Sequence, residues 1–251
     1  MREPDVQENA IDQGDTGVIE VLGTLALRGV LIEVEADFRA RTGLSFAAGY
    51  KSTNAQLAAI SAGATGDVAI MTRQGIEQLV SEGKIVPAST ADLARSGVGL
   101  AVRAGAPRPD ISTPEAFNCA VLAAKSIAFS RIGASGIHFG EVIERLGIAA
   151  EVRRKATISD SYVGEIAARG EAELAVQQVS ELMPVAGIDI VGPLPGDLQK
   201  ISVFSGGVFV AAKHPAGAAK LIAYLASSEL APVLARKGLS PPLAGTSSRS
   251  G

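Results

Sequence analysis

Two stretches of the sequence share one order of elements and decide the fold: "IEVLGTLALRGVLIEVEADFRARTGLSFAAGY" (residues 19–50) and "SIAFSRIGASGIHFGEVIERLGIAAEVRR" (residues 126–154). Each reads as an apolar strand, a loop of small residues, an amphipathic helix, a glycine and a further strand. The helices are clear because apolar side chains recur every three or four residues in 25–41 and in 137–146. Two copies of this unit predict two similar α/β lobes.

A second matching unit follows each stretch: "NAQLAAISAGATGDVAIM" (54–71) and "YVGEIAARGEAELAVQ" (162–177). Both read as a helix, a glycine, an acidic residue and a buried strand. Asp67 and Glu173 take equivalent places before these strands, and we expect them to be solvated or to cap a helix. Strands that alternate with helices along the whole chain predict a parallel-rich α/β architecture.

Two segments break this alternation and predict where the chain passes between the lobes. They are "VGLAVRAGAPRPD" (98–110) and "LQKISVFSGGVFVAA" (198–212). A hinge of two such segments would let the lobes close over a ligand, because few dihedral angles absorb the motion. The predicted boundaries are residues 18–100 with 206–243 for lobe 1, residues 101–205 for lobe 2, and flexible ends at 1–17 and 244–251.

Composition narrows the function classes. The 251 residues carry a net charge of −3 without a basic block, which argues against a nucleic-acid partner. One cysteine, Cys119, and two histidines make a metal centre improbable, and no cofactor is predicted. We expect Cys119 to lie in the core. No apolar run is long enough to span a bilayer, so membrane insertion is not expected.

The order of several segments resembles that of bacterial substrate-binding proteins of the molybdate-binding type. These segments are "VLGTLALRGVLIEVEADFRARTG", "YKSTNAQLAAISAGATGDVAIM", "GLAVRAGAP", "GASGIHFGEVIERLGI", "GEAELAVQQVSEL" and "HPAGAAKLIAYLASSELAPVLARKGL". The resemblance covers about residues 18–243 and implies a type II periplasmic-binding-protein fold. It also implies that the protein delivers a small anion to the membrane component of an ABC importer. The expected location is the periplasm, with a leader removed; a cytoplasmic ligand-sensing module stays open.

The resemblance also implies the ligand-binding loops, which follow strands where open α/β sheets bind ligands. By position, the implied residues are Gly23, Thr24, Leu25, Ser52, Thr53, Asn54, Ala134, Ser135, Gly136 and Gln177. Their neighbours Lys51, Ser130, Arg131 and Gln178 extend the predicted site.

The positively charged side chains in these loops indicate which class of anion the site binds. A guanidinium offers two parallel donors to a planar carboxylate, so Arg131, with Lys51 in the other lobe, favours an organic acid over molybdate. The loop before residue 137 would add the partial positive charge of a helix N-terminus. The alternative is that Ser135 only caps the helix and Arg131 is a solvated surface residue.

The stretch "DISTPEAFNCAVLAAKSIAFS" (110–130) resembles the aconitate-isomerase branch of this fold, whose enzymes move a double bond within a tricarboxylate. Such a reaction needs a base, for which Lys51, Tyr162 and His138 are candidates. The sequence therefore predicts a binding protein for a small anion, with an organic polycarboxylate as the expected ligand. An isomerase of the aconitate type and a binder of molybdate or tungstate remain the alternatives.

Overall fold

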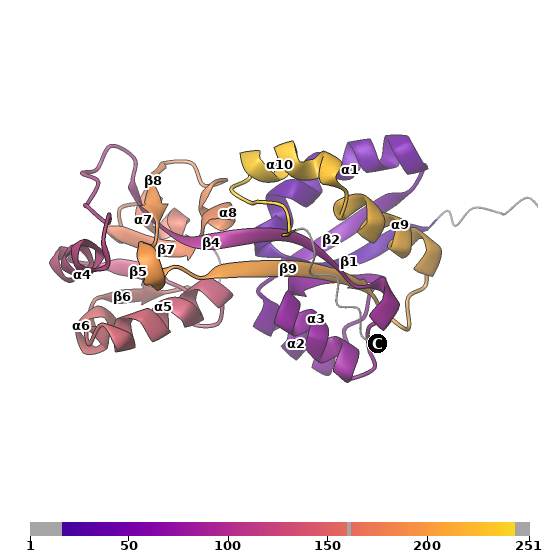
Figure 1. Ribbon diagram of the computed structural model, residues 1–251, viewed down its shortest axis with the longest axis horizontal. Coiled ribbons are helices and arrows are strands. Elements are labelled where there is room, and N and C mark those ends of the chain that lie inside the picture. The colour runs from indigo at the N-terminus through magenta and orange to yellow at the C-terminus, as the bar shows by residue number, and fades with distance from the viewer. Residues whose placement is uncertain (1–16, 160–161, 244–251) are drawn as a thin grey trace, which may run out of the picture.

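The computed structural model describes residues 17–159 and 162–243, which form two α/β lobes side by side (Figure 1). Two long strands, β4 and β9, run between the lobes. The predicted flexible ends, 1–17 and 244–251, lie outside the described residues except for Gly17.

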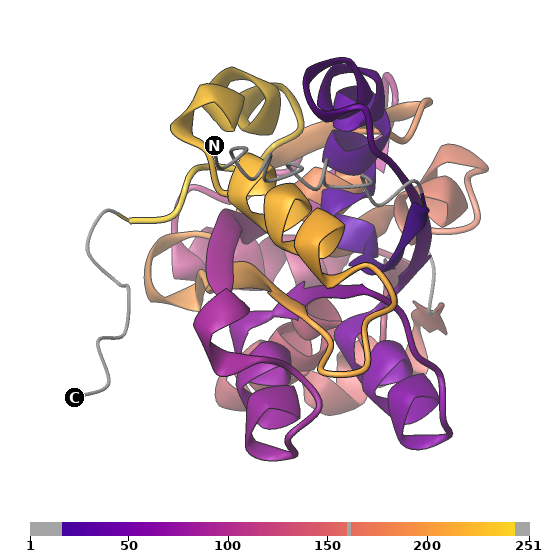
Figure 2. The ribbon, with the colours of Figure 1, turned by 90° about the vertical axis from the view of Figure 1, so that its right-hand side faces the viewer.

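The first lobe contains both ends of the described chain. Its elements are β1 (Val18–Thr24), the 3-10 helix η1 (Leu25–Leu27), α1 (Arg28–Thr42), β2 (Ser45–Lys51), α2 (Thr53–Ser61), β3 (Val68–Thr72), α3 (Arg73–Ser81), η2 (Pro87–Ser89), α9 (Pro215–Leu225), η4 (Ser228–Leu230) and α10 (Ala231–Arg236). Figure 2 looks at this lobe from its outer end, with α1, α9 and α10 on one side of the sheet and α2 and α3 on the other.

The second lobe is built from the middle of the chain. Its elements are α4 (Pro114–Ala123), β5 (Ile127–Phe129), α5 (Ala134–Arg145), α6 (Ala149–Arg154), β6 (Ala156–Ile158), α7 (Gly164–Ala168), β7 (Leu174–Gln178), α8 (Val179–Leu182), β8 (Ile188–Pro193) and η3 (Gly196–Leu198).

One strand, β4, forms backbone hydrogen bonds with strands of both lobes. β4 (Ala91–Arg103) pairs with β9 (Ile201–Val208) through residues 91–97, and then with β7 and β8 through residues 98–103. The strand order is β2-β1-β3-β9-β4-β7-β5-β6, with β8 beside β4. Within each lobe the repeated units form parallel pairs, β1 with β3 and β5 with β7.

Each lobe packs apolar side chains on both faces of its sheet. In the first lobe, α1, α9 and α10 cover a core that includes Phe38 and Leu221, while α2 and α3 cover the other face. In the second lobe, α4, α5 and α6 pack around Phe117 and Phe139, and α7 and α8 cover the opposite face. The same layering in both lobes matches the internal repeat in the sequence.

Three local expectations differ from the structure. The helix expected over 25–41 begins with the short η1 before α1, and Gly43 caps the end of α1 in the left-handed region (φ 72°). Within the segment expected to cross between the lobes (198–212), the strand β9 covers only Ile201–Val208. Cys119 is exposed on α4 rather than buried, since Phe117 and Val121 form the buried stripe of that helix.

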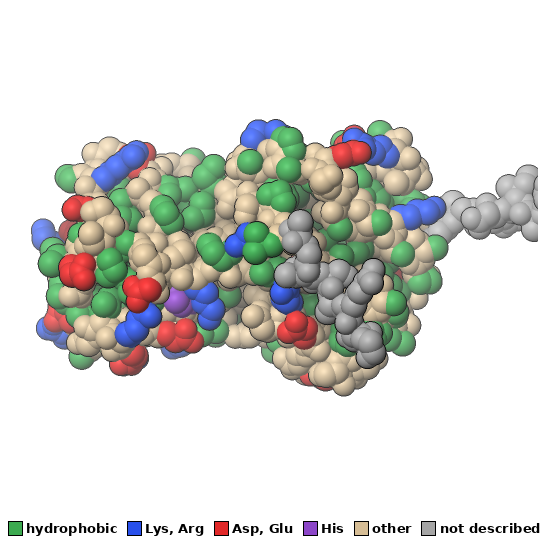
Figure 3. Space-filling model, viewed as in Figure 1, with side chains coloured by type: hydrophobic (Ala, Val, Ile, Leu, Met, Phe, Trp, Pro, Cys, Tyr) green, Lys and Arg blue, Asp and Glu red, His purple; other side chains and the backbone are tan. Residues whose placement is uncertain are grey.

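The surface in Figure 3 shows Lys and Arg side chains interspersed with Asp and Glu. Within the described ranges, no single helix has the length and apolar composition to cross a membrane; α9 with the segment Ser228–Arg236 passes only as a pair, bent by 53°.

Candidate ligand-binding site

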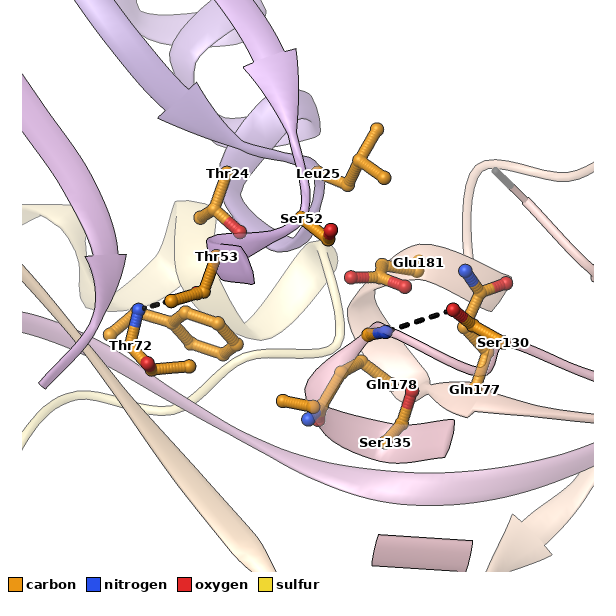
Figure 4. Close-up of a pocket in the computed structure, with 13 residues that line it drawn as sticks. Thr24, Leu25, Ser52, Thr53, Thr72, Ser130, Ser135, Gln177, Gln178 and Glu181 are labelled. Carbon is orange, nitrogen blue, oxygen red and sulfur yellow. Dashed lines mark hydrogen bonds between the residues drawn. The ribbon is translucent and has the colours of Figure 1, made fainter. Parts of the chain in front are cut away.

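A pocket lies between the two lobes, and side chains from both of them line it (Figure 4). The space between the lining residues, including the part open to solvent, is about 380 Å³. The lining residues are Thr24, Leu25, Ser52, Thr53 and Thr72 from the first lobe, Ser130, Gly133, Ala134, Ser135, Gln177, Gln178 and Glu181 from the second, and Phe204 from β9.

The pocket forms where strands of both lobes end. β1 and β3 end at Thr24 and Thr72, β7 ends at Gln178, and Ser130 follows β5 directly. The carboxyl ends of neighbouring parallel strands meet at one edge of a sheet, and the two edges face each other here.

Three helices begin at this pocket. Ser52, Thr72 and Gly133 are the N-cap residues of α2, α3 and α5, and all three line the pocket. The first N–H groups of a helix have no partner within it and carry a partial positive charge. The three helix ends therefore make the space between the lobes favourable for negative charge.

Hydroxyl groups add donors to these helix ends. Ser130 Oγ accepts a hydrogen bond from the backbone N of Gly133 (2.9 Å), and Thr53 Oγ1 accepts one from the backbone N of Thr72 (3.1 Å), as Figure 4 shows. Ser52 Oγ accepts from the backbone N of Ala55 (3.4 Å). A hydroxyl oxygen that accepts from an N–H group keeps its own hydrogen for donation. These three side chains can therefore donate to an anion.

The two glutamines at the end of β7 form different hydrogen bonds. Gln177 is 2% exposed, and its Oε1 accepts from the backbone N of Val163 (2.8 Å). Gln178 is also buried and is hydrogen-bonded to Ser202 Oγ (2.9 Å) next to the crossing strand β9. Both fix the pocket wall, and Gln177 also contacts the acid described next.

Glu181, on α8, carries the titratable group of the pocket wall. Its carboxylate faces the space between the lobes (Figure 4) and is hydrogen-bonded to the side chain of Gln177. Burial raises the pKa of Glu181 to about 7, against the hydrogen bond from Gln177, which lowers it. Sequence reasoning missed this residue, together with Thr72 and Phe204.

Most residues predicted for the site line the pocket, but some do not. Lys51, Asn54 and Arg131 are exposed and lie outside the lining set. Gly23 is buried, and its carbonyl accepts from Gln56 Nε2 (2.7 Å). Gly136 is buried behind the lining, in the first turn of α5.

The three bases suggested by the sequence are not among the lining residues either. Lys51 is on the surface. His138 is 9% exposed, and its Nε2 lies 2.8 Å from the carbonyl oxygen of Leu198 in the second lobe. Tyr162 is 9% exposed and lies beside the pocket, its hydroxyl 3.5 Å from the carbonyl oxygen of Leu25. Burial raises the pKa of Tyr162, against a hydrogen bond from Arg28, which lowers it.

A few contacts join the two lobes at the rim of the pocket. Asn54 Nδ2 donates to the carbonyl oxygen of Ile132 at 3.1 Å. The guanidinium of Arg28 in the first lobe lies 5.9 Å from the ring centre of Tyr162 in the second, and 5.8 Å from that of Tyr50 in its own lobe. Together with the Tyr162 hydroxyl near Leu25, these contacts hold the lobes against each other beside the pocket.

The exposure of Arg131 sets the size of its effect. A charge in contact with water contributes little to an ion pair, so we expect Arg131→Ala to weaken binding of a carboxylate less than about fivefold. Isothermal titration calorimetry with the variant and the unmodified protein measures this change. A loss of about a hundredfold would show that Arg131 turns into the pocket and binds the ligand directly.

The donor set of the pocket suits an anion better than a metal. Among the described residues, no three His, Cys, Asp or Glu side chains lie together in a way that could hold a metal ion. The lining offers mainly hydroxyl and backbone N–H groups, which donate to oxygens of a ligand.

Two α/β lobes around a pocket at the ends of their strands define the type II periplasmic-binding-protein fold, as the family resemblance implied. The chain belongs to the bacterial extracellular solute-binding protein family, whose sequence model matches residues 19–240. It is 40% identical to an aconitate isomerase of Pseudomonas sp. over 177 residues, which make up 70% of this chain and 67% of that protein.

Solved structures share the fold at low sequence identity. The periplasmic molybdate-binding protein of Azotobacter vinelandii superposes with a TM-score of 0.75 at 19% identity, over 89% of this chain and 99% of that one. The substrate-binding domain of a molybdenum ABC transporter from Clostridium difficile, described as putative, gives a TM-score of 0.67 at 16% identity, over 89% and 98% of the chains. The predicted fold class and family resemblance are confirmed.

Proposed function

We propose that this chain binds a small polycarboxylate in the pocket between its lobes and moves a double bond within it. The observation that carries the binding part is the convergence of three helix N-termini and three donating hydroxyls on one space. The aconitate isomerase of Pseudomonas sp., at 40% identity, supports the reaction.

The placement of donors on both lobes favours a ligand with more than one carboxylate. Ser52 and Thr53 would meet one carboxylate from the first lobe, and Ser130 with the start of α5 would meet another from the second. Hydrogen bonds to an ionised acceptor are about twice as strong as those between neutral groups. A polycarboxylate that spans the pocket would therefore bind both lobes together.

Calorimetry and NMR test this proposal on the unmodified protein. We expect cis-aconitate, trans-aconitate and the saturated analogue tricarballylate to bind at least tenfold more tightly than molybdate. Proton NMR should also show the interconversion of cis- and trans-aconitate. Tight binding of molybdate without binding of the tricarboxylates would exclude the proposed ligand class.

Ser135 provides a direct probe of the pocket. Its side chain is 2% exposed and lines the pocket from the first turn of α5. Loss of a hydrogen bond to a charged group costs about 1.5–3 kcal/mol, so Ser135→Ala should lower tricarboxylate affinity about 10- to 100-fold. The matched control is Ser228→Ala, at an exposed position in η4 of the first lobe. Equal affinities of the two variants would show that the ligand binds elsewhere.

A carrier function is the second candidate, and the family match and the fold favour it. Delivery of a carboxylate to an ABC importer would require a periplasmic location and a membrane component that recognises the closed lobes. A carrier binds its solute unchanged, so binding of both aconitate isomers without interconversion would favour this function over isomerisation.

A further inference from the structure

We propose that Glu181 is the catalytic acid and base that removes and returns the proton in this pocket. This inference rests on the proposed function and adds to it the residue that performs the chemistry. None of the three bases suggested by the sequence lies in the lining, whereas Glu181 does.

Position is the first argument. Among the lining residues, all of them within the part of the chain that the structure describes, Glu181 alone carries a group that titrates near neutrality. Its carboxylate faces the donors of the first lobe across the pocket (Figure 4). A ligand held by Ser52 and Thr53 on one side and by Ser130 on the other would lie directly against it.

The environment of this carboxylate is the second argument. The rest of the pocket wall presents hydrogen-bond donors to an anion. A carboxylate in this wall repels an anionic ligand, so its presence there points to a chemical role. Burial makes Glu181 a stronger base than an ordinary glutamate, and a pKa near the working pH is the optimum for proton transfer. Gln177 holds the carboxylate in place, and Gln177 is itself fixed by Val163.

The reaction needs only one such group. Glu181 takes a proton from the CH₂ group next to the double bond, and the electron pair of the broken C–H bond forms a new C=C bond with the central carbon. The electrons of the former double bond then take the same proton from Glu181 at the far carbon. The two carbons are separated by a single atom, so one carboxylate on one face reaches both. Negative charge that develops on the substrate is stabilised by the hydroxyls and by the helix N-termini.

The test is the variant Glu181→Gln, which keeps the size of the side chain and its hydrogen bond to Gln177. We expect the turnover of aconitate to fall about 10²- to 10⁴-fold, while tricarballylate affinity stays within tenfold of the unmodified protein. Glu181→Asp should retain intermediate activity. The matched control is Glu165→Gln, an exposed residue on α7 of the same lobe. The same reaction in D₂O reports proton exchange at the CH₂ group.

The outcomes separate the two proposals. If the unmodified protein interconverts the isomers and Glu181→Gln keeps more than a tenth of that activity, Glu181 is not the base although the proposed function stands. If the unmodified protein exchanges the CH₂ protons in D₂O without isomerisation and Glu181→Gln does not, Glu181 is the base and the proposed reaction fails. Absence of both processes overturns the two proposals together.

Discussion

Gly136→Ala is expected to lower the free energy of unfolding by about 3 kcal/mol or more, near the upper end for an overpacked site. A Cβ atom at this position would lie 1.6 Å from the carbonyl oxygen of Ser130 and 2.5 Å from its carbonyl carbon. These are backbone atoms that no change of rotamer removes. The start of α5 would have to move away from the end of β5.

The same displacement should also damage the pocket, because Ser130 and Ser135 line it on either side of this contact. Urea unfolding gives the stability, and calorimetry gives the affinity for a tricarboxylate. Gly140→Ala is the matched control on the same helix, since a Cβ there meets nothing within 4 Å. Alanine is favoured over glycine in a helix, so this control should stabilise the protein by up to about 1 kcal/mol. Equal stability of the two variants would contradict the close packing of β5 and α5.

Asp67→Asn is expected to cost about 3 kcal/mol of stability. Asp67 is 1% exposed, and its carboxylate accepts three backbone N–H groups, from Glu20 (2.8 Å), Lys213 (2.7 Å) and His214 (2.9 Å). An asparagine can accept with only one oxygen, and its NH₂ group would face a donor. A buried donor left without a partner costs about 1–3 kcal/mol, and hydrogen bonds to a charged group are among the stronger ones.

The pH dependence of stability gives this prediction a second readout. Burial raises the pKa of Asp67, but the hydrogen bonds from Glu20, His214 and Lys213 outweigh burial and hold it below its usual value. The folded state thus binds the proton more weakly than the unfolded chain. The stabilisation is complete above the unfolded pKa, about 4, and is lost as the pH falls through the lower folded value.

Urea unfolding between pH 7 and pH 2 measures this dependence. The difference in the free energy of unfolding between the unmodified protein and Asp67→Asn should decrease as the pH is lowered. Asp110→Asn is the control, because the exposed Asp110 accepts a backbone N–H only from Ser112, and it should cost less than about 1 kcal/mol. A difference that stays constant with pH would show that Asp67 does not act through its charge.

The internal repeat explains why so much of the site was predictable. Strand, loop and helix recur in both lobes, so the sequence pattern alone predicts that loops after equivalent strands meet at one pocket. Nine predicted residues line it: Thr24, Leu25, Ser52, Thr53, Ser130, Ala134, Ser135, Gln177 and Gln178. Strand ends are readable from sequence because apolar runs stop there.

The direction of a side chain was not readable in the same way. Arg131 and Lys51 belong to the correct loops but are exposed, since loop residues have no periodicity that fixes a face. Glu181 was missed because an acidic residue in a short helix resembles a surface residue. Thr72 could have been found, since it ends β3 as Gln178 ends β7.

The role of Asp67 was predicted incorrectly for a related reason. A solvated or capping role was expected, whereas the structure buries its carboxylate among backbone donors from β1 and from the segment after β9. Glu20 lies 47 residues from Asp67 in the sequence, and Lys213 lies 146 residues from it. No local sequence pattern can reveal partners at such separations. Its counterpart Glu173 is exposed and accepts from the backbone N of Lys125 at 2.8 Å.

The small number of contacts across the rim has a consequence for the rate at which a solute can come and go. The hydrogen bond from Asn54 to Ile132 and the cation–π contact of Arg28 with Tyr162 contribute about 1 kcal/mol each. Together, these two contacts favour closure of the lobes about thirtyfold. Bonds that a solute makes to both lobes would add to these contacts and lengthen the lifetime of the complex. If the proposed conversion weakens either set of bonds, the product would leave faster than the substrate.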